Sequence, residues 1–211
     1  MTGKFITFEG IDGSGKSTQV ALLKERLEAL DRTVAIVREP GGTVLSEQIR
    51  GLLLDHHSRD LSKRAEALLF STARAQLVHE VIIPALERGE IVLCDRYADS
   101  TIAYQGYGRE LPLNEIITIQ EFATKNLQPD LRVLLDLNVD VAASRLLGSY
   151  ADRMESAGKA FQMRVRQGYL TMARAAPDNW LVIDGDQPKE KIAAGIASRV
   201  GKEIIKGSLE L

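Results

Sequence analysis

A chain of 211 residues can bury one full hydrophobic core and is short for two, so we expect a single domain over residues 1–211. Hydrophobic residues make up 45% and charged residues 27%, and the formal net charge of −2 argues against nucleic acid as the main partner, because a phosphate polymer calls for excess cations. A single cysteine excludes an intramolecular disulfide, and the three histidines lack the spacing of metal ligands. The sequence has no signal-peptide pattern and no apolar run near 18 residues, which predicts a cytoplasmic protein without a membrane partner.

Apolar residues follow one another, instead of alternating, in five short runs that are typical of buried parallel strands: 5–8, 34–37, 91–94, 133–137 and 180–183. Helical spacing of apolar residues predicts helices at about 20–30, 44–54, 63–86, 113–125, 139–147, 159–175 and 192–204. This alternation predicts an α/β fold with a parallel sheet covered by helices on both faces. The polar stretch 148–158 is expected to form an exposed, mobile lid.

Residues 10–17 follow the first predicted strand and fit the phosphate-loop pattern G-x-x-x-x-G-K-[ST] at every fixed position. In such a loop successive backbone N–H groups face phosphate oxygens, Lys16 bridges the β- and γ-phosphates, and the hydroxyl of Ser17 binds Mg²⁺. A glycine-rich turn with a solvated lysine is the alternative, which the order of strand, loop and helix disfavours. No Asn-Lys-x-Asp motif follows, so we expect ATP instead of a guanine nucleotide, bound by Gly10, Ile11, Asp12, Gly13, Ser14, Gly15, Lys16, Ser17 and Thr18.

The second predicted strand leads into Arg-Glu-Pro-Gly-Gly-Thr at 38–43, a charged pair followed by a sharp turn. On the long helix that follows, Phe70 and Arg74 are four residues apart and share a face, so a ring and a guanidinium could stack on a base and donate to its edge. By spacing alone, however, a core phenylalanine and a solvated arginine are the more common arrangement.

The third predicted strand ends in Leu-Cys-Asp-Arg-Tyr at 93–97, which places Asp95 and Arg96 at the carboxyl edge of the sheet, where ligands of open α/β folds bind. Asp95 is a candidate for binding Mg²⁺ through water. Arg96 is a candidate for binding an acceptor phosphate with a bidentate pair of hydrogen bonds from its guanidinium. An ordinary surface ion pair is the alternative. Cys94 has no recognisable base nearby and is expected to be a small buried residue.

Taken together, these motifs resemble the bacterial thymidylate kinases over nearly the whole chain. The residues that carry the resemblance are 8–17, 38–43, Leu-Phe-Ser-Thr-Ala-Arg at 69–74, 95–97, Ala-Tyr-Gln-Gly at 103–106, Pro-Asp-Leu at 129–131 and Asp-Arg-Met-Glu at 152–155. The resemblance implies a P-loop fold with a five-stranded parallel sheet, transfer of the γ-phosphate of ATP to dTMP with Mg²⁺ in dTTP biosynthesis, and a homodimer formed through helices.

The resemblance also implies how the base of dTMP is bound. Phe70 would stack on thymine and Arg74 would donate to its edge, which reverses the interpretation from spacing alone. Thr101 and Gln105 would lie near the polar positions of the base. Pro40 would line the pocket for the C5-methyl group.

For the sugar and phosphate, the resemblance implies that Tyr104 crowds the 2′ position and that Asp12 accepts a hydrogen bond from the 3′-hydroxyl. Arg96, together with Arg38 or Arg50, would hold the phosphate. The acceptor oxygen is already an anion near pH 7, so the protein mainly aligns two phosphates and neutralises charge.

On the ATP side, the phosphate loop lacks a basic residue between its outer glycines, and this resembles the form of the family whose transition-state arginine comes from the lid. Arg153 is our candidate, with Arg145 and Arg164 in competition. Gln187 is implied to lie against adenine, with Arg145 as a stacking partner. Glu39 would help to position an arginine or the metal ligands.

Two alternatives remain at this point. Another nucleoside monophosphate kinase would share the phosphate loop and differ in its acceptor. A nucleotide-binding sensor without transfer would not need the acceptor-side residues.

Overall fold

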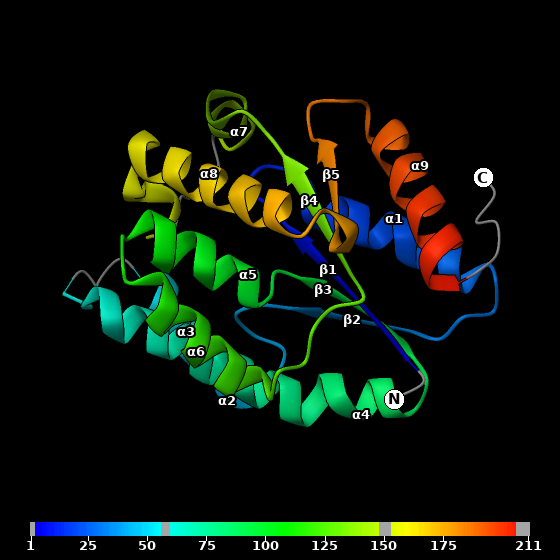
Figure 1. The fold of residues 1–211 in the computed structure, drawn as a ribbon, viewed down its shortest axis with the longest axis horizontal. Helices are drawn as coiled ribbons and strands as arrows, with labels where there is room; N and C mark the ends of the chain where they lie inside the picture. The colour runs from blue at the N-terminus through cyan, green and yellow to red at the C-terminus, as the bar shows by residue number, and fades with distance from the viewer. Residues whose placement is uncertain (1–2, 56–59, 148–152, 206–211) are drawn as a thin grey trace.

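The structure, a computed structural model, describes residues 3–55, 60–147 and 153–205. Within these ranges five strands form one parallel sheet in the order β2-β3-β1-β4-β5 (Figure 1). Their bounds are β1 Lys4–Glu9, β2 Val34–Arg38, β3 Ile91–Asp95, β4 Leu131–Asp136 and β5 Trp180–Asp184. The expected α/β architecture is therefore confirmed, and all five predicted strands lie within a residue or two of their observed bounds.

The helices of the described part are α1 Lys16–Glu28, α2 Val44–Leu54, α3 Lys63–Leu77, α4 Ile83–Glu87, α5 Ala98–Thr101, α6 Leu113–Thr124, α7 Val139–Arg145, α8 Lys159–Ala175 and α9 Lys189–Val200. Local capping marks several starts, because the side chains of Thr43, Ser62 and Asn138 accept hydrogen bonds from backbone N–H groups of the first turn. No helix in this part of the chain has the length and apolarity that crossing a membrane requires.

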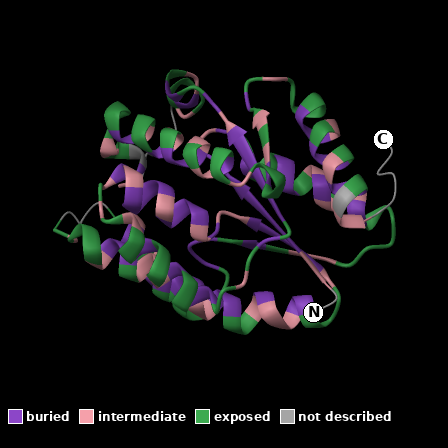
Figure 2. Cartoon of the chain, in the orientation of Figure 1, coloured by how far each residue is buried: buried purple, intermediate pink, exposed green. Residues whose placement is uncertain are grey.

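The three central strands, β1, β3 and β4, are buried on both faces, because their side chains alternate between the two sides and helices cover each side. Ile6 and Phe8 of β1 pack in one core with apolar residues of α1 and α9, and Figure 1 shows these two helices together on that side. Phe5 and Cys94 pack on the other face against the helical region 77–86. Figure 2 shows the resulting buried stripe along the sheet and the inner helix faces, with exposed residues outside.

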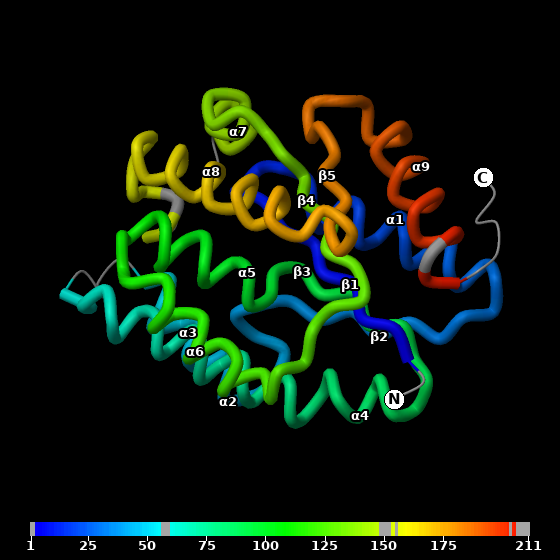
Figure 3. Tube along the Cα trace, viewed as in Figure 1, coloured from blue at the N-terminus to red at the C-terminus, as the bar shows by residue number. Residues whose placement is uncertain are grey.

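Three features of the helical layer differ from the expectation. The helix predicted at 63–86 is interrupted by a π-helical segment, η1 Val78–Ile82, that joins α3 to α4. The region after β3, for which no helix was predicted, forms α5 and a second π-helical segment, η2 Ile102–Gly108, which packs against α8 from far along the chain (Figure 3). A further π-helical segment, η5 Gly201–Ile205, follows α9.

The predicted lid at 148–158 falls partly outside the described residues, which resume at Arg153. In the described part of this stretch Met154 is buried in a core with α8, whereas Ser156 and Gly158 are exposed, and the lid itself stays a prediction. A short 3-10 helix, η3 Glu155–Ala157, and Gly158 then lead into α8, while a second one, η4 Pro177–Asn179, precedes β5.

Candidate functional site

The phosphate loop connects β1 to α1 at the carboxyl edge of the sheet. Gly10 has φ 135°, and a Cβ atom there would lie 2.6 Å from the carbonyl oxygen of Leu135 in β4, so the turn requires glycine. Lys16 begins α1, and its buried ammonium donates to the carbonyl oxygens of Gly10 at 3.1 Å and Ile11 at 3.0 Å. The loop is thus curled around its own lysine, as a phosphate cradle requires.

Arg96 follows β3 in a left-handed backbone conformation, with φ 71°, and its N–H donates to the carbonyl of Phe8. Its guanidinium donates to the Asp12 carboxylate at 2.6 Å and to the carbonyl of Gly10 at 2.9 Å, and it lies over the ring of Tyr104. The structure therefore joins the expected acceptor arginine to the phosphate loop. A non-glycine residue held at positive φ is typical of functional sites.

One carboxylate, Asp12, lies between two cationic side chains, Lys16 and Arg96, at the phosphate loop. Burial would raise the pKa of Asp12, but Arg96 and Lys16 outweigh it and hold that pKa at about 2. Burial, together with repulsion from Arg96, lowers the pKa of Lys16 to about 8. Asp12 therefore stays ionised at neutral pH, and a bound polyphosphate would favour the charged form of Lys16.

The two residues expected to bind Mg²⁺ lie together, since the Ser17 hydroxyl donates to the Asp95 carboxylate at 2.6 Å. Within the described ranges no group of three or more His, Cys, Asp or Glu side chains could hold a metal. One hydroxyl and one carboxylate fit Mg²⁺, which usually takes one or two protein ligands and completes its shell with phosphate oxygens and water.

Two cavities meet at the phosphate loop. The first, which we call the loop cavity, has an empty volume of about 980 Å³ and is lined by Asp12, Gly13, Gly15, Lys16, Ser17, Thr18, Arg38, Glu39, Arg50, Asp95, Arg96 and Arg145. The second, the helix cavity, has about 550 Å³ and is lined by Asp12, Glu39, Pro40, Arg50, Leu54, Phe70, Arg74, Arg96, Ser100, Thr101, Tyr104, Gln105 and Met154. They share Asp12, Glu39, Arg50 and Arg96.

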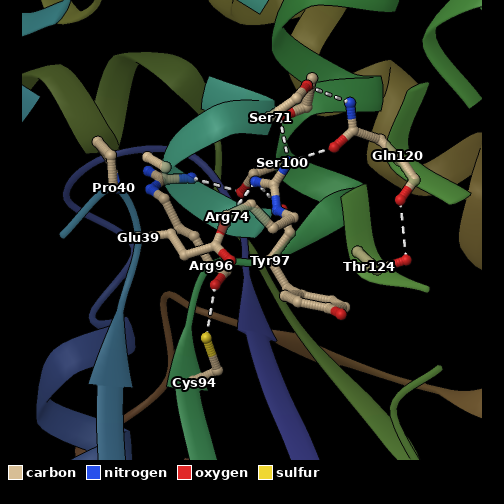
Figure 4. Close-up of polar contacts among 12 residues, drawn as sticks. Glu39, Pro40, Ser71, Arg74, Cys94, Arg96, Tyr97, Ser100, Gln120 and Thr124 are labelled. Carbon is tan, nitrogen blue, oxygen red and sulfur yellow. Dashed lines mark hydrogen bonds and ion pairs between the residues drawn. The ribbon is translucent and has the colours of Figure 1, made fainter. Parts of the chain in front are cut away.

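The helix cavity contains a fully buried arginine, Arg74, which Figure 4 shows between Glu39 and Gln120. Its NH1 donates to the hydroxyl of Thr101 at 2.8 Å and to the side chain of Gln120, and its NH2 pairs with Glu39 and donates to the carbonyl of Tyr97 at 2.9 Å. Its Nε–H is buried and donates to no group of the described residues. One donor of this cavity-lining residue thus has no protein acceptor in the described part of the chain.

The remaining predicted acceptor residues divide between the two cavities. Pro40, Phe70, Tyr104 and Gln105 line the helix cavity, as expected for contacts with a base and sugar. Arg38 lines only the loop cavity, where it pairs with Glu47 at 3.0 Å. Its NH1 also donates to the carbonyl of Pro40 at 3.4 Å, so Arg38 lies next to the turn that lines the helix cavity.

Arg50 lines both cavities and donates to the Pro40 carbonyl at 2.9 Å. Of the two arginines that the resemblance left open for the dTMP phosphate, it therefore has the more central position.

The three competing arginines have different surroundings. Arg145 of α7 lines the loop cavity, donates to the carbonyl of Gly185 at 3.0 Å and pairs with Asp186 at 2.9 Å. Arg153 instead pairs with the buried Glu66 at 2.6 Å, and Arg164 donates to the carbonyl of Gly108. Only Arg145 of these three lines the loop cavity.

Four predicted ATP contacts do not line the loop cavity, namely Gly10, Ile11, Ser14 and Gln187. Gln187 is half-buried after β5 and lines neither cavity. Ile11 is buried and faces the groove between the loop and α7, and Ser14 is also buried.

The sequence analysis missed two carboxylates that support the site. Glu9, at the end of β1, is fully buried and accepts hydrogen bonds from the hydroxyls of Ser100 and Tyr169 and from the N–H of Tyr97. A charged residue ending an otherwise apolar strand was the signal that could have revealed it. Glu66 lies one turn before Phe70 on the same helix face, a spacing that the sequence did contain.

Comparison with known proteins shows which family the chain resembles. The thymidylate kinase family model matches residues 8–196. A thymidylate kinase of Bifidobacterium longum (strain DJO10A) is 51% identical over 203 residues, covering 95% of this chain and 98% of that protein. Those of Citrifermentans bemidjiense and Kosmotoga olearia are each 50% identical, covering 87% and 89% of this chain and 84% and 90% of their own lengths. The chain therefore belongs to the thymidylate kinase family.

Proposed function

We propose that this kinase binds dTMP in the helix cavity and ATP in the loop cavity, and transfers the γ-phosphoryl group to give dTDP and ADP. The observation that carries the proposal is that Arg74, which lines the helix cavity, has a buried Nε–H without a protein acceptor among the described residues. A buried donor left unpaired is costly, and a carbonyl of thymine would remove that cost.

The other walls of the helix cavity support the same ligand. Phe70 offers a ring face for stacking, Pro40 an apolar surface for the C5-methyl group, and Gln105 an amide for the hydrogen-bonding edge of the base. Tyr104 donates to Asp12 at 3.1 Å, which places a bulky ring against the position of the sugar. Discrimination against ribose would then be steric.

Transfer would take place where the cavities meet. Arg96 would hold the acceptor phosphate and Lys16 the β- and γ-phosphates of ATP, so that the two reacting groups approach across Asp12. Asp12, with its pKa near 2, would remain a carboxylate that orients Arg96 and accepts from the sugar 3′-hydroxyl. No strong general base is required, because the attacking phosphate oxygen is an anion.

Ser17 and Asp95 would hold Mg²⁺, which supplies neutralisation of charge on the transferring phosphoryl group. Arg145 is the arginine that we propose for contact with ATP, because it lines the loop cavity beside the carbonyl of Gly13. For Arg153 to assist transfer, as the sequence predicts, it would have to leave Glu66.

The reaction is tested by incubating the protein with MgATP and separate monophosphates, and separating the products by ion-exchange chromatography. We expect dTDP from dTMP at a rate far above the rates with CMP or AMP. Faster turnover of CMP or AMP would assign another acceptor, and ADP release that is independent of any acceptor would favour a sensor.

We further propose a homodimer built from a single-domain protomer, in the cytoplasm where ATP is available. Large apolar side chains are exposed on three neighbouring helices, α2, α3 and α6, at Val44, Leu45, Leu52, Leu68, Ile117 and Phe122. Exposed apolar residues gathered on adjacent elements favour a protein contact.

A further inference from the structure

A buried carboxylate, Glu66 of α3, lies behind the helix cavity and gathers three donors from distant parts of the chain. Its Oε1 accepts from the amide Nε2 of Gln105 at 2.8 Å and from Nε of Arg109 at 3.1 Å. Its Oε2 accepts from NH2 of Arg109 at 3.1 Å and from NH1 of Arg153 at 2.6 Å. Glu66 itself does not line the helix cavity, whereas its partner Gln105 does.

The contact with Glu66 decides which end of the Gln105 amide is left for the ligand. An ionised carboxylate can only accept hydrogen bonds, so the NH₂ end of the amide must face Glu66. The carbonyl end then remains for the cavity that Gln105 lines. The contact with Glu66 thus determines which way the Gln105 amide is turned, with its nitrogen toward Glu66 and its oxygen toward the cavity.

Ionisation of Glu66 supports this orientation. Burial opposes the charged form, but hydrogen bonds from Arg109, Gln105 and Arg153 outweigh it and lower the pKa of Glu66 below its usual value. The group is therefore an acceptor throughout the neutral range, and the amide has one favoured orientation.

We infer that Glu66 is a positioning residue for base specificity: it holds Gln105 with its carbonyl toward the base, which selects thymine over cytosine. Thymine presents an N3–H donor, which this carbonyl can accept, whereas cytosine presents an N3 acceptor, which would face the carbonyl without a proton between them. Arg74 adds a donor, suited to the C4 carbonyl of thymine and not to the C4 amino group of cytosine. This inference rests on the proposed binding of dTMP in the helix cavity.

The isosteric change Glu66→Gln tests the inference because it alters donors and acceptors while keeping the shape. The new amide oxygen is favoured at the Oε2 position, where NH2 of Arg109 and NH1 of Arg153 both donate. Its NH₂ group then faces Gln105, whose amide must turn its carbonyl toward it and its own NH₂ toward the base. That arrangement opposes thymine N3–H and suits cytosine N3.

The measurement is kcat/KM for dTMP and for dCMP at saturating MgATP, together with KM for ATP and a thermal melt. For Glu66→Gln we expect the dTMP:dCMP ratio to fall about 10- to 100-fold, the cost of an unpaired buried group, with KM for ATP unchanged. An unchanged ratio, with both substrates affected equally, would overturn the inference.

Arg109→Met is the matched control, because it removes two hydrogen bonds to Glu66 and leaves the contact between Glu66 and Gln105 in place. We expect it to lower the melting temperature while the dTMP:dCMP ratio stays within about twofold of wild type. A loss of selectivity equal to that of Glu66→Gln would mean general loosening of the site, and the inference would fail.

The double variant Glu66→Gln, Gln105→Glu exchanges the two groups and restores an amide–carboxylate pair with an acceptor toward the base. Recovery of most of the wild-type dTMP:dCMP ratio supports the inference, and a ratio as low as that of Glu66→Gln overturns it. Should the single variant fail to fold, the double variant decides alone: a ratio below a tenth of wild type counts against the inference. If wild-type protein phosphorylates no dTMP, the proposed function itself has failed.

Discussion

Arg96 is one of the four residues that line both cavities. It follows β3 at positive φ, donates to Asp12 and Gly10, and lies over Tyr104, so its guanidinium is fixed before any ligand binds. Such preorganisation favours transition-state charge, because no reorganisation is needed during transfer.

We predict that Arg96→Lys lowers kcat by about 100-fold or more, since an ammonium cannot replace the planar fork that contacts both the loop and a phosphate. The melting temperature should fall only slightly, and KM for ATP should change little. Steady-state kinetics with varied dTMP and varied ATP check this. Near-normal kcat in a folded variant would remove Arg96 from the transfer step.

Glu9 makes stability depend on pH. Burial, reinforced by Asp99, raises its pKa to about 7, although Ser100, Arg96 and Tyr169 oppose the rise. Between the ordinary glutamate pKa and about 7 the folded protein therefore binds more protons than the unfolded chain, so the free energy of unfolding falls as pH rises through that interval. Above about 7 this contribution stays constant.

Comparison of wild type with Glu9→Gln isolates the effect, because glutamine does not titrate. From pH 5 to pH 7.5 wild type should lose on the order of 2–3 kcal/mol more stability than the variant, as measured by urea unfolding. Parallel pH profiles for the two proteins would show that Glu9 does not titrate in this range.

At the scale of elements, α7 and the segment that begins at Arg153 place their arginines differently. Arg145 extends from α7 into the loop cavity, and Arg153 is tied to α3 through Glu66 and to α2 through the carbonyl of Leu53 at 2.9 Å. Arg145 therefore lines the cavity in which we propose that ATP binds, whereas Arg153 connects its own segment to two helices, α2 and α3.

We therefore expect Arg145→Ala to raise KM for ATP by about tenfold or more, since a charge-assisted contact is lost. Arg153→Ala should mainly lower the melting temperature, because it leaves one donor fewer on a buried carboxylate. Kinetics and melts of both variants, side by side, check the difference. A drop in kcat of orders of magnitude for Arg153→Ala, with Arg145→Ala unaffected, would return the transfer role to Arg153.

At the scale of the whole molecule, exposed apolar side chains on α2, α3 and α6 favour association of two copies. Phe122 of α6 is 88% exposed and Val44 of α2 is 79% exposed, values that are costly for large apolar groups in water.

We predict a dimer in light scattering coupled to size-exclusion chromatography, and a monomer for Phe122→Lys, because a charge would be buried at the contact. Lys125→Ala, at the end of the same helix, serves as a control that should remain dimeric. A monomeric wild type at micromolar concentration would contradict the prediction.

Local sequence determined the parts of this protein that depend on a few neighbouring residues. The order of Gly10, Gly13, Gly15 and Lys16 after an apolar run predicts the loop, and continuous apolar runs predict the buried strands, because backbone conformation and burial at these places follow from nearby residue types. The family's motifs likewise contain many of the residues that line the two cavities, although not Leu54 or Ser100.

Only the tertiary structure decided how distant side chains pair. Glu66 meets Gln105, Arg109 and Arg153 across 39, 43 and 87 positions, and Glu9 meets Tyr169 across 160. No local pattern specifies such contacts, because they depend on how β1, α3, η2 and α8 pack. The sequence thus determined which chemical groups are present at the site. Packing decided whether each group presents a donor or an acceptor to the ligand, and we propose that the kinase selects its base by this property.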